Sequence, residues 1–282
     1  MGTQFWWFFD VIIVSIAFGV FYSAVSRGIR KGLFPFVSLA LAVVLGWFGS
    51  QFLTPRVYEE LFQDSIRTAV SNQLQQEEWD IYGAAADSIL ISQEDADWDE
   101  EEMRRIQEKA EKKQNTDYDE RYITAISNAA EAQILTAKKP HSTERLQTVF
   151  KEDHDAFYHF LEYLDQDDPD AAAALIEVKW YHSGYQTLVR CALFLLIEIL
   201  MLIISGIISS MNKHDEDAEV GKADRLLAVP VGLVEACCYV LIAAIAVQFL
   251  VVLTDSQMLL FNSDTIQKTR IFRYIYDFVS NF

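Results

Sequence analysis

Four long apolar runs constrain this chain more than any other feature of its sequence. A helix that crosses about 30 Å of hydrocarbon needs roughly 20 mostly apolar residues. Four runs reach that length, and charged or turn-forming residues end each of them: 5–25, 33–53, 187–209 and 226–253. A single soluble core rarely holds four such runs, because polar residues must also cover it. The sequence therefore predicts an all-α, polytopic membrane protein with four transmembrane helices.

A long acidic insertion, residues 54–186, separates the second run from the third. It holds 30 of the 41 Asp and Glu residues and 13 of the 23 Lys and Arg residues, which gives a local net charge of −17. Such a segment repels phosphates, so nucleic acid is not an expected partner. Apolar residues recur at helical spacing in 56–76, 117–137 and 143–164. We expect a soluble helical domain there, with a flexible acidic stretch at 92–102.

The runs and the insertion divide the chain into four parts. Residues 1–53 form one transmembrane hairpin, 54–186 the insertion, 187–253 a second hairpin, and 254–282 a C-terminal tail. In the tail, apolar residues follow a helical spacing: Ile271, Ile275, Phe278, Val279 and Phe282. This pattern predicts an amphipathic helix that lies in the membrane interface or packs against the insertion.

Basic residues in short loops indicate how the chain is oriented. Lys and Arg in such loops mark the cytoplasmic side of a membrane protein. The turn 26–32 contains Arg27, Arg30 and Lys31 without any acid, and the loop 210–225 contains another three basic residues. We therefore expect both loops in the cytoplasm, and the N-terminus, the insertion and the tail outside. Because these charges follow the first run and do not precede it, we expect that run to be retained and not cleaved as a signal peptide.

Motifs of enzymes and metal sites do not occur in the sequence. There is no G-x-S-x-G, H-E-x-x-H, Walker A or C-x-x-C pattern. Asp153, His154 and Asp155, with His159 nearby, offer carboxylate and imidazole ligands. Adjacent helical residues point in different directions, however, and a spacing of five does not stack two histidines. We interpret this cluster as a solvated helix face, and expect no enzyme activity, no cofactor and no metal site.

The cysteines do not indicate a disulfide framework. All three fall inside apolar runs, and none lies in the acidic insertion: Cys191, Cys237 and Cys238. We expect them to act as small buried hydrophobic residues.

Four ionisable residues inside the apolar runs are the candidate functional residues. Each costs about 3 kcal/mol or more in hydrocarbon. Glu198 and Glu235 lie about 16 and 14 Å from the same membrane face at a rise of 1.5 Å per residue. Each is either protonated and hydrogen-bonded to a neighbouring helix or part of a proton or ion path. Asp10 and Arg190 lie near the outer ends of their runs, where they snorkel to the interface or pair.

Short motifs occur at the starts of three of these runs. An aspartate leads the first apolar run, a Gly- and Arg-containing turn precedes the second, and an Asp-Arg-Leu-Leu stretch with a later glycine enters the fourth. The residues of these motifs are Asp10, Arg27, Gly28, Arg30, Gly32, Asp224, Arg225 and Gly232. Together they resemble the colicin V production protein family, also called CvpA-like, a group of small bacterial inner-membrane proteins. Two features depart from the family pattern: Ala228 stands where the family usually has glycine, and the insertion is far longer than the usual link.

The resemblance implies a multi-pass protein of the bacterial cytoplasmic membrane with a role in colicin V or toxin production or export and in envelope maintenance. We expect a non-enzymatic component that contacts the lipid bilayer and binds a protein partner through the insertion, and the sequence leaves a homo-oligomer open. The alternative is a transporter or channel subunit that uses Glu198 and Glu235.

Overall fold

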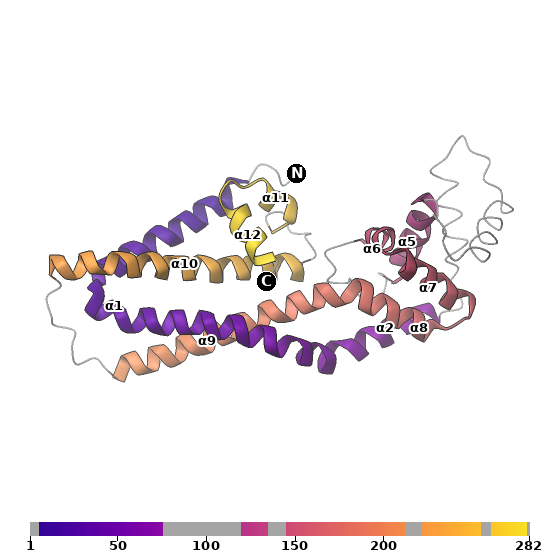
Figure 1. The fold of residues 1–282 in the computed structure, drawn as a ribbon, viewed down its shortest axis with the longest axis horizontal. Helices are drawn as coiled ribbons and strands as arrows, with labels where there is room; N and C mark the ends of the chain where they lie inside the picture. The colour runs from indigo at the N-terminus through magenta and orange to yellow at the C-terminus, as the bar shows by residue number, and fades with distance from the viewer. Residues whose placement is uncertain (1–5, 76–119, 135–144, 212–220, 255–260, 281–282) are drawn as a thin grey trace. The chain divides into compact units, whose positions relative to one another are not determined.

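The computed structural model describes residues 6–75, 120–134, 145–211, 221–254 and 261–280 (Figure 1). Every regular element in these ranges is a helix, so the predicted all-α class is confirmed for the described part of the chain. The acidic stretch expected at 92–102 lies outside the described residues.

The chain divides into two compact units, and each is described by itself. Unit 1 consists of Met1–Tyr58 and Gln186–Phe282, and unit 2 consists of Glu59–Tyr185. The described helices of unit 1 have these bounds: α1 (Trp7–Tyr58), most of α9 (His182–Met211), α10 (Lys222–Leu253), α11 (Ser263–Gln267) and α12 (Phe272–Ser280).

Three helices in the described part are long and apolar enough to cross a membrane. They span Trp7–Leu74, Pro169–Ile208 and Lys222–Leu253. The sequence predicted four spans, and the difference lies in the first helix, which contains both of the first two predicted runs. Length and composition alone therefore make these helices compatible with a membrane protein.

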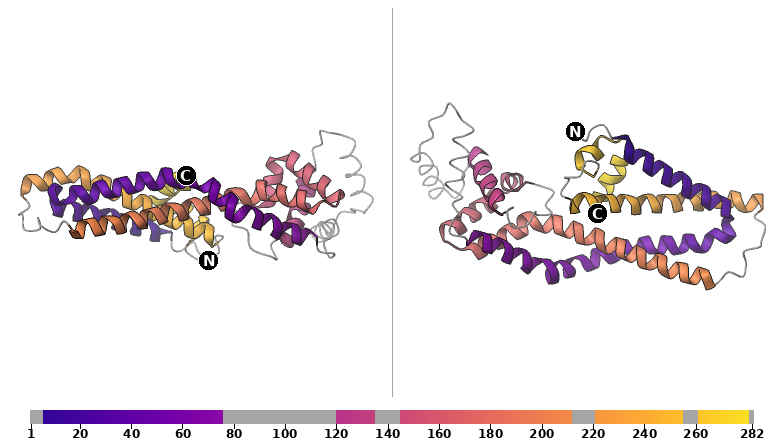
Figure 2. Two further views of the ribbon diagram at one scale, coloured as in Figure 1. Left: turned by 90° about the horizontal axis from the view of Figure 1, so that it is seen from below. Right: turned by 180° about the vertical axis from the view of Figure 1, so that it is seen from behind.

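Gly28 divides α1 into two arms, an N-terminal arm (residues 7–27) and a second arm (residues 29–58). Its φ of 73° and ψ of 170° are not helical, and residues with a side chain rarely adopt such a φ. Figures 1 and 2 show that the chain reverses direction at this point. The glycine therefore turns one continuous apolar segment into a hairpin of two helical arms.

Small residues bring the helices of unit 1 close together. A Cβ atom added to Gly232 of α10 would lie 3.1 Å from Cβ of Ala24 in the N-terminal arm. A Cβ atom added to Gly49 of the second arm would lie 3.1 Å from Ile197 of α9. Small residues at such positions allow helix backbones to approach each other. Thus α10 packs along the N-terminal arm, and α9 packs on the second arm.

The C-terminal helix α12 packs on α10 and α1. Its buried face is formed by Phe272, Tyr276 and Val279, and the ring of Phe272 stacks on Phe9 with centroids 5.1 Å apart. The sequence pattern placed Ile271 and Phe278 on the apolar face, but both are exposed. The contact with Phe9 explains the difference, because it rotates a helix that is apolar on more than one side.

Unit 2 is also helical, and its elements are short. They are the π-helix η2 (Glu59–Gln63), α2 (Asp64–Leu74), α5 (Glu120–Ile134), α6 (Leu146–Glu152), α7 (His154–Asp165), α8 (Pro169–Ile176) and the π-helix η3 (Glu177–Tyr181). Aspartates separate the last helices. Asp153 interrupts the helical pattern of 143–164 and caps α7 by accepting from the Ala156 N–H at 3.0 Å. Asp168 caps α8 in the same way, with Pro169 at the first helical position.

Aromatic side chains dominate the core of unit 2. The rings of Phe150 and Phe160 lie 5.3 Å apart, and Phe157 packs edge-on against Phe150 at 5.4 Å. All three side chains are fully buried. Aliphatic residues from α2, α5 and α8 complete this core: Ile66, Val70, Ile123, Ile126, Ala172 and Ile176. Such a core needs no lipid to bury its apolar surface.

We predict that the fragment 59–185 folds as a helical protein without detergent. Replacing Phe157 by Ala should lower its free energy of unfolding by about 3–5 kcal/mol, because a large buried ring is lost. The neighbouring Tyr158 is half-exposed, so Tyr158→Ala should change stability by less than about 1 kcal/mol. Circular dichroism during urea unfolding measures both effects. A random-coil spectrum of the wild-type fragment would contradict the prediction.

Candidate functional site

An ion pair joins the N-terminal arm of α1 to α10. The Arg27 guanidinium donates from Nη2 to Oε1 of Glu235 at 2.6 Å. The Glu235 side chain is buried, whereas that of Arg27 is about one-third exposed. Breaking a buried pair is costly because it leaves an uncompensated charge in a low-dielectric site. Glu235, a candidate from the sequence, therefore has a cationic partner that the sequence had assigned only to a loop.

The local sequence explains why these two side chains meet. Arg27 lies one helical turn after Ala24, and Glu235 lies one turn after Gly232, so each pair shares a helix face. Ala24 and Gly232 are in close contact across the two helices. Gly28 ends the N-terminal arm directly after Arg27. Three of the residues that carry the family resemblance, Arg27, Gly28 and Gly232, therefore build one helix contact.

Glu198 is the second buried carboxylate, and it lies on α9. It is 1% exposed, and neither of its oxygens has a hydrogen-bond partner among the described residues. A Cβ atom at Gly46 of the second arm would lie only 3.1 Å from Oε1 of Glu198. The glycine therefore leaves the space that the carboxylate occupies.

The two glutamates share electrostatic neighbours on α10. The charges of both Glu198 and Glu235 act on Cys238 and Tyr239, and the charge of Arg27 also acts on Tyr239. The sequence placed the two glutamates at matching depth on successive helices. We define these electrostatic neighbours, Arg27, Glu198, Glu235, Cys238 and Tyr239, as the polar centre, in which Arg27 and Glu235 form the direct contact.

Asp10 lies outside the polar centre and binds the start of the C-terminal helix. Its carboxylate accepts hydrogen bonds from three successive backbone N–H groups, those of Arg270, Ile271 and Phe272, at 2.9, 3.0 and 2.8 Å. Because α12 begins at Phe272, Asp10 supplies the acceptor that the free N–H groups of this helix end need. A negative charge there also complements the helix dipole. The aspartate thus attaches the C-terminal helix to the start of α1.

The remaining sequence candidates lie at other positions on α1, α9 and α10. Arg190 is partly buried on α9, next to the buried Cys191. Arg30 and Arg225 are exposed, and Asp224 lies in the first turn of α10. Gly32 is buried, and a Cβ atom there would meet nothing within 4 Å.

Two members of the Asp and His cluster of unit 2, Asp153 and His159, contact other side chains. The described residues contain no group of three or more His, Cys, Asp or Glu side chains that could hold a metal ion. Asp153 instead receives a hydrogen bond from Lys179 Nζ at 2.7 Å, and this contact holds the pKa of Asp153 below its usual value. His159 lies 3.3 Å from Glu162 on the exposed side of α7.

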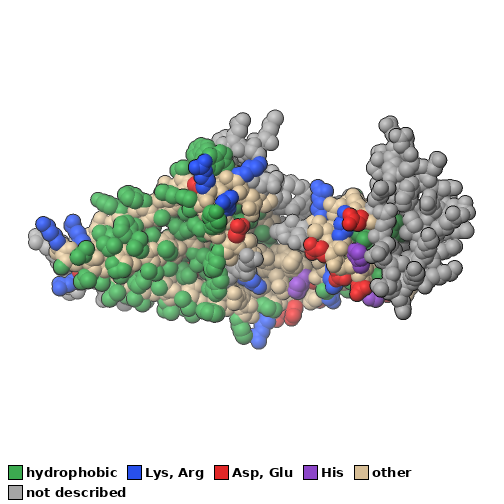
Figure 3. Space-filling model, turned by 45° about the horizontal axis from the view of Figure 1, so that its top comes forward, with side chains coloured by type: hydrophobic (Ala, Val, Ile, Leu, Met, Phe, Trp, Pro, Cys, Tyr) green, Lys and Arg blue, Asp and Glu red, His purple; other side chains and the backbone are tan. Residues whose placement is uncertain are grey.

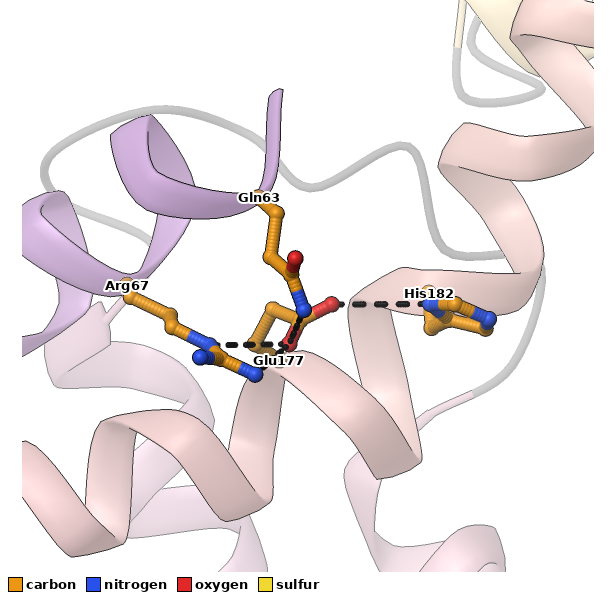
Figure 4. A network of polar contacts seen from close by, with 4 residues as sticks. All are labelled: Gln63, Arg67, Glu177 and His182. Carbon is orange, nitrogen blue, oxygen red and sulfur yellow. Dashed lines mark hydrogen bonds and ion pairs between the residues drawn. The ribbon is translucent and has the colours of Figure 1, made fainter. Parts of the chain in front are cut away.

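Unit 2 contains a buried network of polar contacts that the sequence did not predict (Figure 4). Glu177 is fully buried and accepts from Arg67 Nε at 3.1 Å and from Gln63 Nε2 at 3.5 Å, while His182 Nδ1 lies 3.5 Å from its other oxygen. Glu177 begins η3 and Gln63 ends η2, so the network joins two π-helical segments, which often mark functional positions. The available signal was Glu177 itself, a glutamate directly after the apolar stretch 171–176.

Comparison of the chain with protein-family models, with curated proteins and with solved structures finds no match.

We predict that Arg27→Gln destabilises the protein more than Glu235→Gln, because the first change leaves a buried carboxylate alone and the second leaves a partly solvated cation. The expected cost of Arg27→Gln is about 3 kcal/mol. The double variant should recover most of this loss, because no charge remains unpaired. The midpoint of thermal unfolding of each detergent-solubilised variant gives the order of their stabilities. Arg30→Gln, an exposed control three residues away, should leave the midpoint unchanged, and an equal effect at Arg27 and Arg30 would contradict the prediction.

We also predict that Asp10→Ala loosens α12, with Asp10→Asn intermediate because one acceptor oxygen remains. A lost helix cap costs about 1–2 kcal/mol, which corresponds to a roughly 5- to 30-fold increase in opening. The measurement is the rate of thiol labelling at Val279→Cys, a buried position, after all three native cysteines have been replaced by alanine. Unchanged labelling in Asp10→Ala would rule out the anchoring role.

Proposed function

We propose that this chain is a multi-pass membrane protein in which both arms of α1, α9 and α10 cross the bilayer. The supporting observation is the extent of exposed apolar surface on these helices, visible across most of the face of unit 1 in Figure 3. Soluble monomers rarely expose contiguous apolar patches larger than a few hundred Å². The exposed side chains include Phe18, Val37, Leu41, Phe48, Ile199, Ile203, Ile207, Leu226 and Leu233.

The reversal at Gly28 supports the proposal of four crossings. The N-terminal arm, residues 7–27, is about 32 Å long at 1.5 Å per residue, and the second arm is longer. Each arm alone can therefore cross about 30 Å of hydrocarbon. The positive φ of Gly28 supports counting α1 as two spans joined by a tight turn.

In this proposal the basic turn faces the cytoplasm. Arg30 and Lys31 follow Gly28, and Lys222 and Arg225 lie at the start of α10. The positive-inside rule puts both segments on the cytoplasmic side. Unit 2 then lies outside the cytoplasm, and the resemblance to the CvpA-like family favours the bacterial cytoplasmic membrane.

The role we propose is that of a non-enzymatic membrane component, linked through the resemblance to colicin V or toxin production or export and to envelope maintenance. Unit 2 supports a scaffold role, because it has an aromatic core of its own and can present a surface to a protein partner. The proposal of a CvpA-like protein rests on the motif residues alone. Asp10, Arg27, Gly28 and Gly232 among them form the tertiary contacts described above.

Topology gives the direct test of this proposal. A reporter enzyme that works only outside the cytoplasm should be active when it is inserted within residues 100–140 and silent when it is inserted at Gly28. The reverse pattern would invert the orientation. Activity of a cytoplasmic reporter at both positions would instead exclude an odd number of crossings between them, and with it the four-span proposal.

A second candidate function, a proton-coupled transporter or channel subunit, is favoured by Glu198. A carboxylate without a partner in a low-dielectric site is far more stable when it carries a proton. Ionisable residues that face the interior of a membrane bundle often belong to proton pathways. Tyr239 interacts electrostatically with Glu198, Glu235 and Arg27, so polar side chains that such a pathway could use lie near Glu198.

We predict that, if the protein conducts protons, Glu198→Gln abolishes the conduction. The measurement is the pH inside proteoliposomes that contain a trapped fluorescent indicator. Glu152→Gln, which removes an exposed carboxylate of α6, is the matched control and should behave as wild type. Equal fluxes in wild type and Glu198→Gln would exclude this function and leave the scaffold role.

A further inference from the structure

Helix α12 has two apolar faces and one narrow polar face. Phe272, Tyr276 and Val279 lie at i, i+4 and i+7 and are buried against the rest of unit 1. Ile271, Tyr274 and Phe278 lie at i, i+3 and i+7 on a neighbouring side, and they are 50%, 63% and 62% exposed. At 100° per residue the two sets form adjacent stripes, with Arg273, Asp277 and Ser280 on the remaining side. The second stripe, Ile271, Tyr274 and Phe278, is called the outer stripe below.

Basic side chains surround the outer stripe. Lys268 and Arg270 are exposed just before α12, and Arg273 lies beside Tyr274 with its guanidinium 4.6 Å from the ring centroid. Asp277 is the one acid from Thr265 to Ser280. It accepts a hydrogen bond from Gln267 at 3.1 Å. The segment that carries the outer stripe is therefore cationic.

The neighbours of α12 are themselves apolar on their outward sides. Phe278 stacks on Trp47 of the second arm, with ring centroids 5.9 Å apart. Trp7 at the start of α1 and Leu253 at the end of α10 are also exposed, and α12 packs on both of these helices. The guanidinium of Arg270 lies 5.3 Å from the Trp6 ring centroid. Aromatic and cationic side chains of this kind gather at the head-group level of a bilayer.

We propose that the outer stripe and its three cations bind the head-group region of anionic phospholipids. This inference rests on the proposed function, because it needs α1 and α10 to lie in a bilayer. A helix with an apolar side and Lys and Arg beside it binds an anionic lipid surface through buried area and charge together. Asp10 does not oppose the anionic head groups with a free charge, because its carboxylate is occupied by the three backbone N–H groups of α12.

The test uses the full-length protein, with its three native cysteines replaced by alanine, in phosphatidylcholine vesicles. An environment-sensitive dye is attached at Phe278→Cys or, as a control, at Phe48→Cys on the exposed side of the second arm. The vesicles contain equal mole fractions of brominated phosphatidylglycerol or brominated phosphatidylcholine, which quench a dye in contact with them. We expect the dye at 278 to be quenched severalfold more by the anionic lipid, and the dye at 48 to be quenched equally by both.

The variant Lys268→Gln/Arg270→Gln/Arg273→Gln separates charge from burial. It should equalise the quenching at 278 by the two lipids, and added salt should do the same in the wild type. Protection of Val279→Cys from labelling verifies that α12 remains docked in the variant, and the salt titration tests the charge without any substitution. Equal quenching by the two lipids in the wild type would overturn the preference for anionic lipid.

The dye at position 48 distinguishes a failure of the proposed membrane protein from a failure of the inference about anionic lipid. If the dye at 48 is not quenched by either lipid, the chain does not lie in the bilayer and the proposed function fails with the inference. If the dye at 48 is quenched and the dye at 278 is not, the membrane proposal stands. In that case the outer stripe faces water or protein, and the inference about lipid is rejected.

Discussion

The positive φ of Gly28 is the constraint on which the arrangement of unit 1 depends. A side chain at this position would disfavour the conformation that reverses α1. The reversal lets the N-terminal arm pack on α10 and the second arm pack on α9, so that the N-terminal arm contributes Arg27 to the polar centre and the second arm lies against Glu198. Arg27 precedes the glycine directly and can therefore reach Glu235, while Gly46 on the other arm leaves space for Glu198. One backbone conformation thus positions two carboxylates on different helices.

The carboxylates of unit 1 differ in the groups that balance their charge. This difference distinguishes carboxylates that hold segments together from one that does not. Asp10 is compensated by three backbone donors and Glu235 by a guanidinium. Each of these contacts holds two segments together. Glu198 has no such contact among the described residues, although it is as deeply buried as Glu235. A charge buried without a partner costs stability unless the carboxyl carries a proton, so Glu198 differs from the two carboxylates that hold segments together.

The sequence predicted what depends on local spacing, and the rest depends on contacts between distant residues. Helical periodicity located α2, α5 and the segment that contains α6 and α7, but it did not predict the interruption at Asp153. The Asp-Pro pair at 168 and 169 predicted the break before α8. The pairing of Arg27 with Glu235 joins residues 208 apart in the chain, and Asp10 binds backbone 260 residues away. Depth along a helix predicted that Glu198 and Glu235 lie at a similar level of the membrane. It could not reveal Arg27 as a partner, because an arginine at the end of an apolar run was assigned to the loop.

The orientation of α12 shows how a distant contact decides between faces that the sequence leaves equivalent. Apolar residues cover two adjacent sides of this helix, so periodicity alone does not determine which side is buried. The stack of Phe272 on Phe9 and the capping of the helix by Asp10 come from neighbouring positions of α1, and together they fix both the start and the rotation of α12. With Phe272, Tyr276 and Val279 turned inward, Ile271, Tyr274 and Phe278 must face outward. A charged residue at the beginning of an apolar run therefore determines which surface the C-terminus presents.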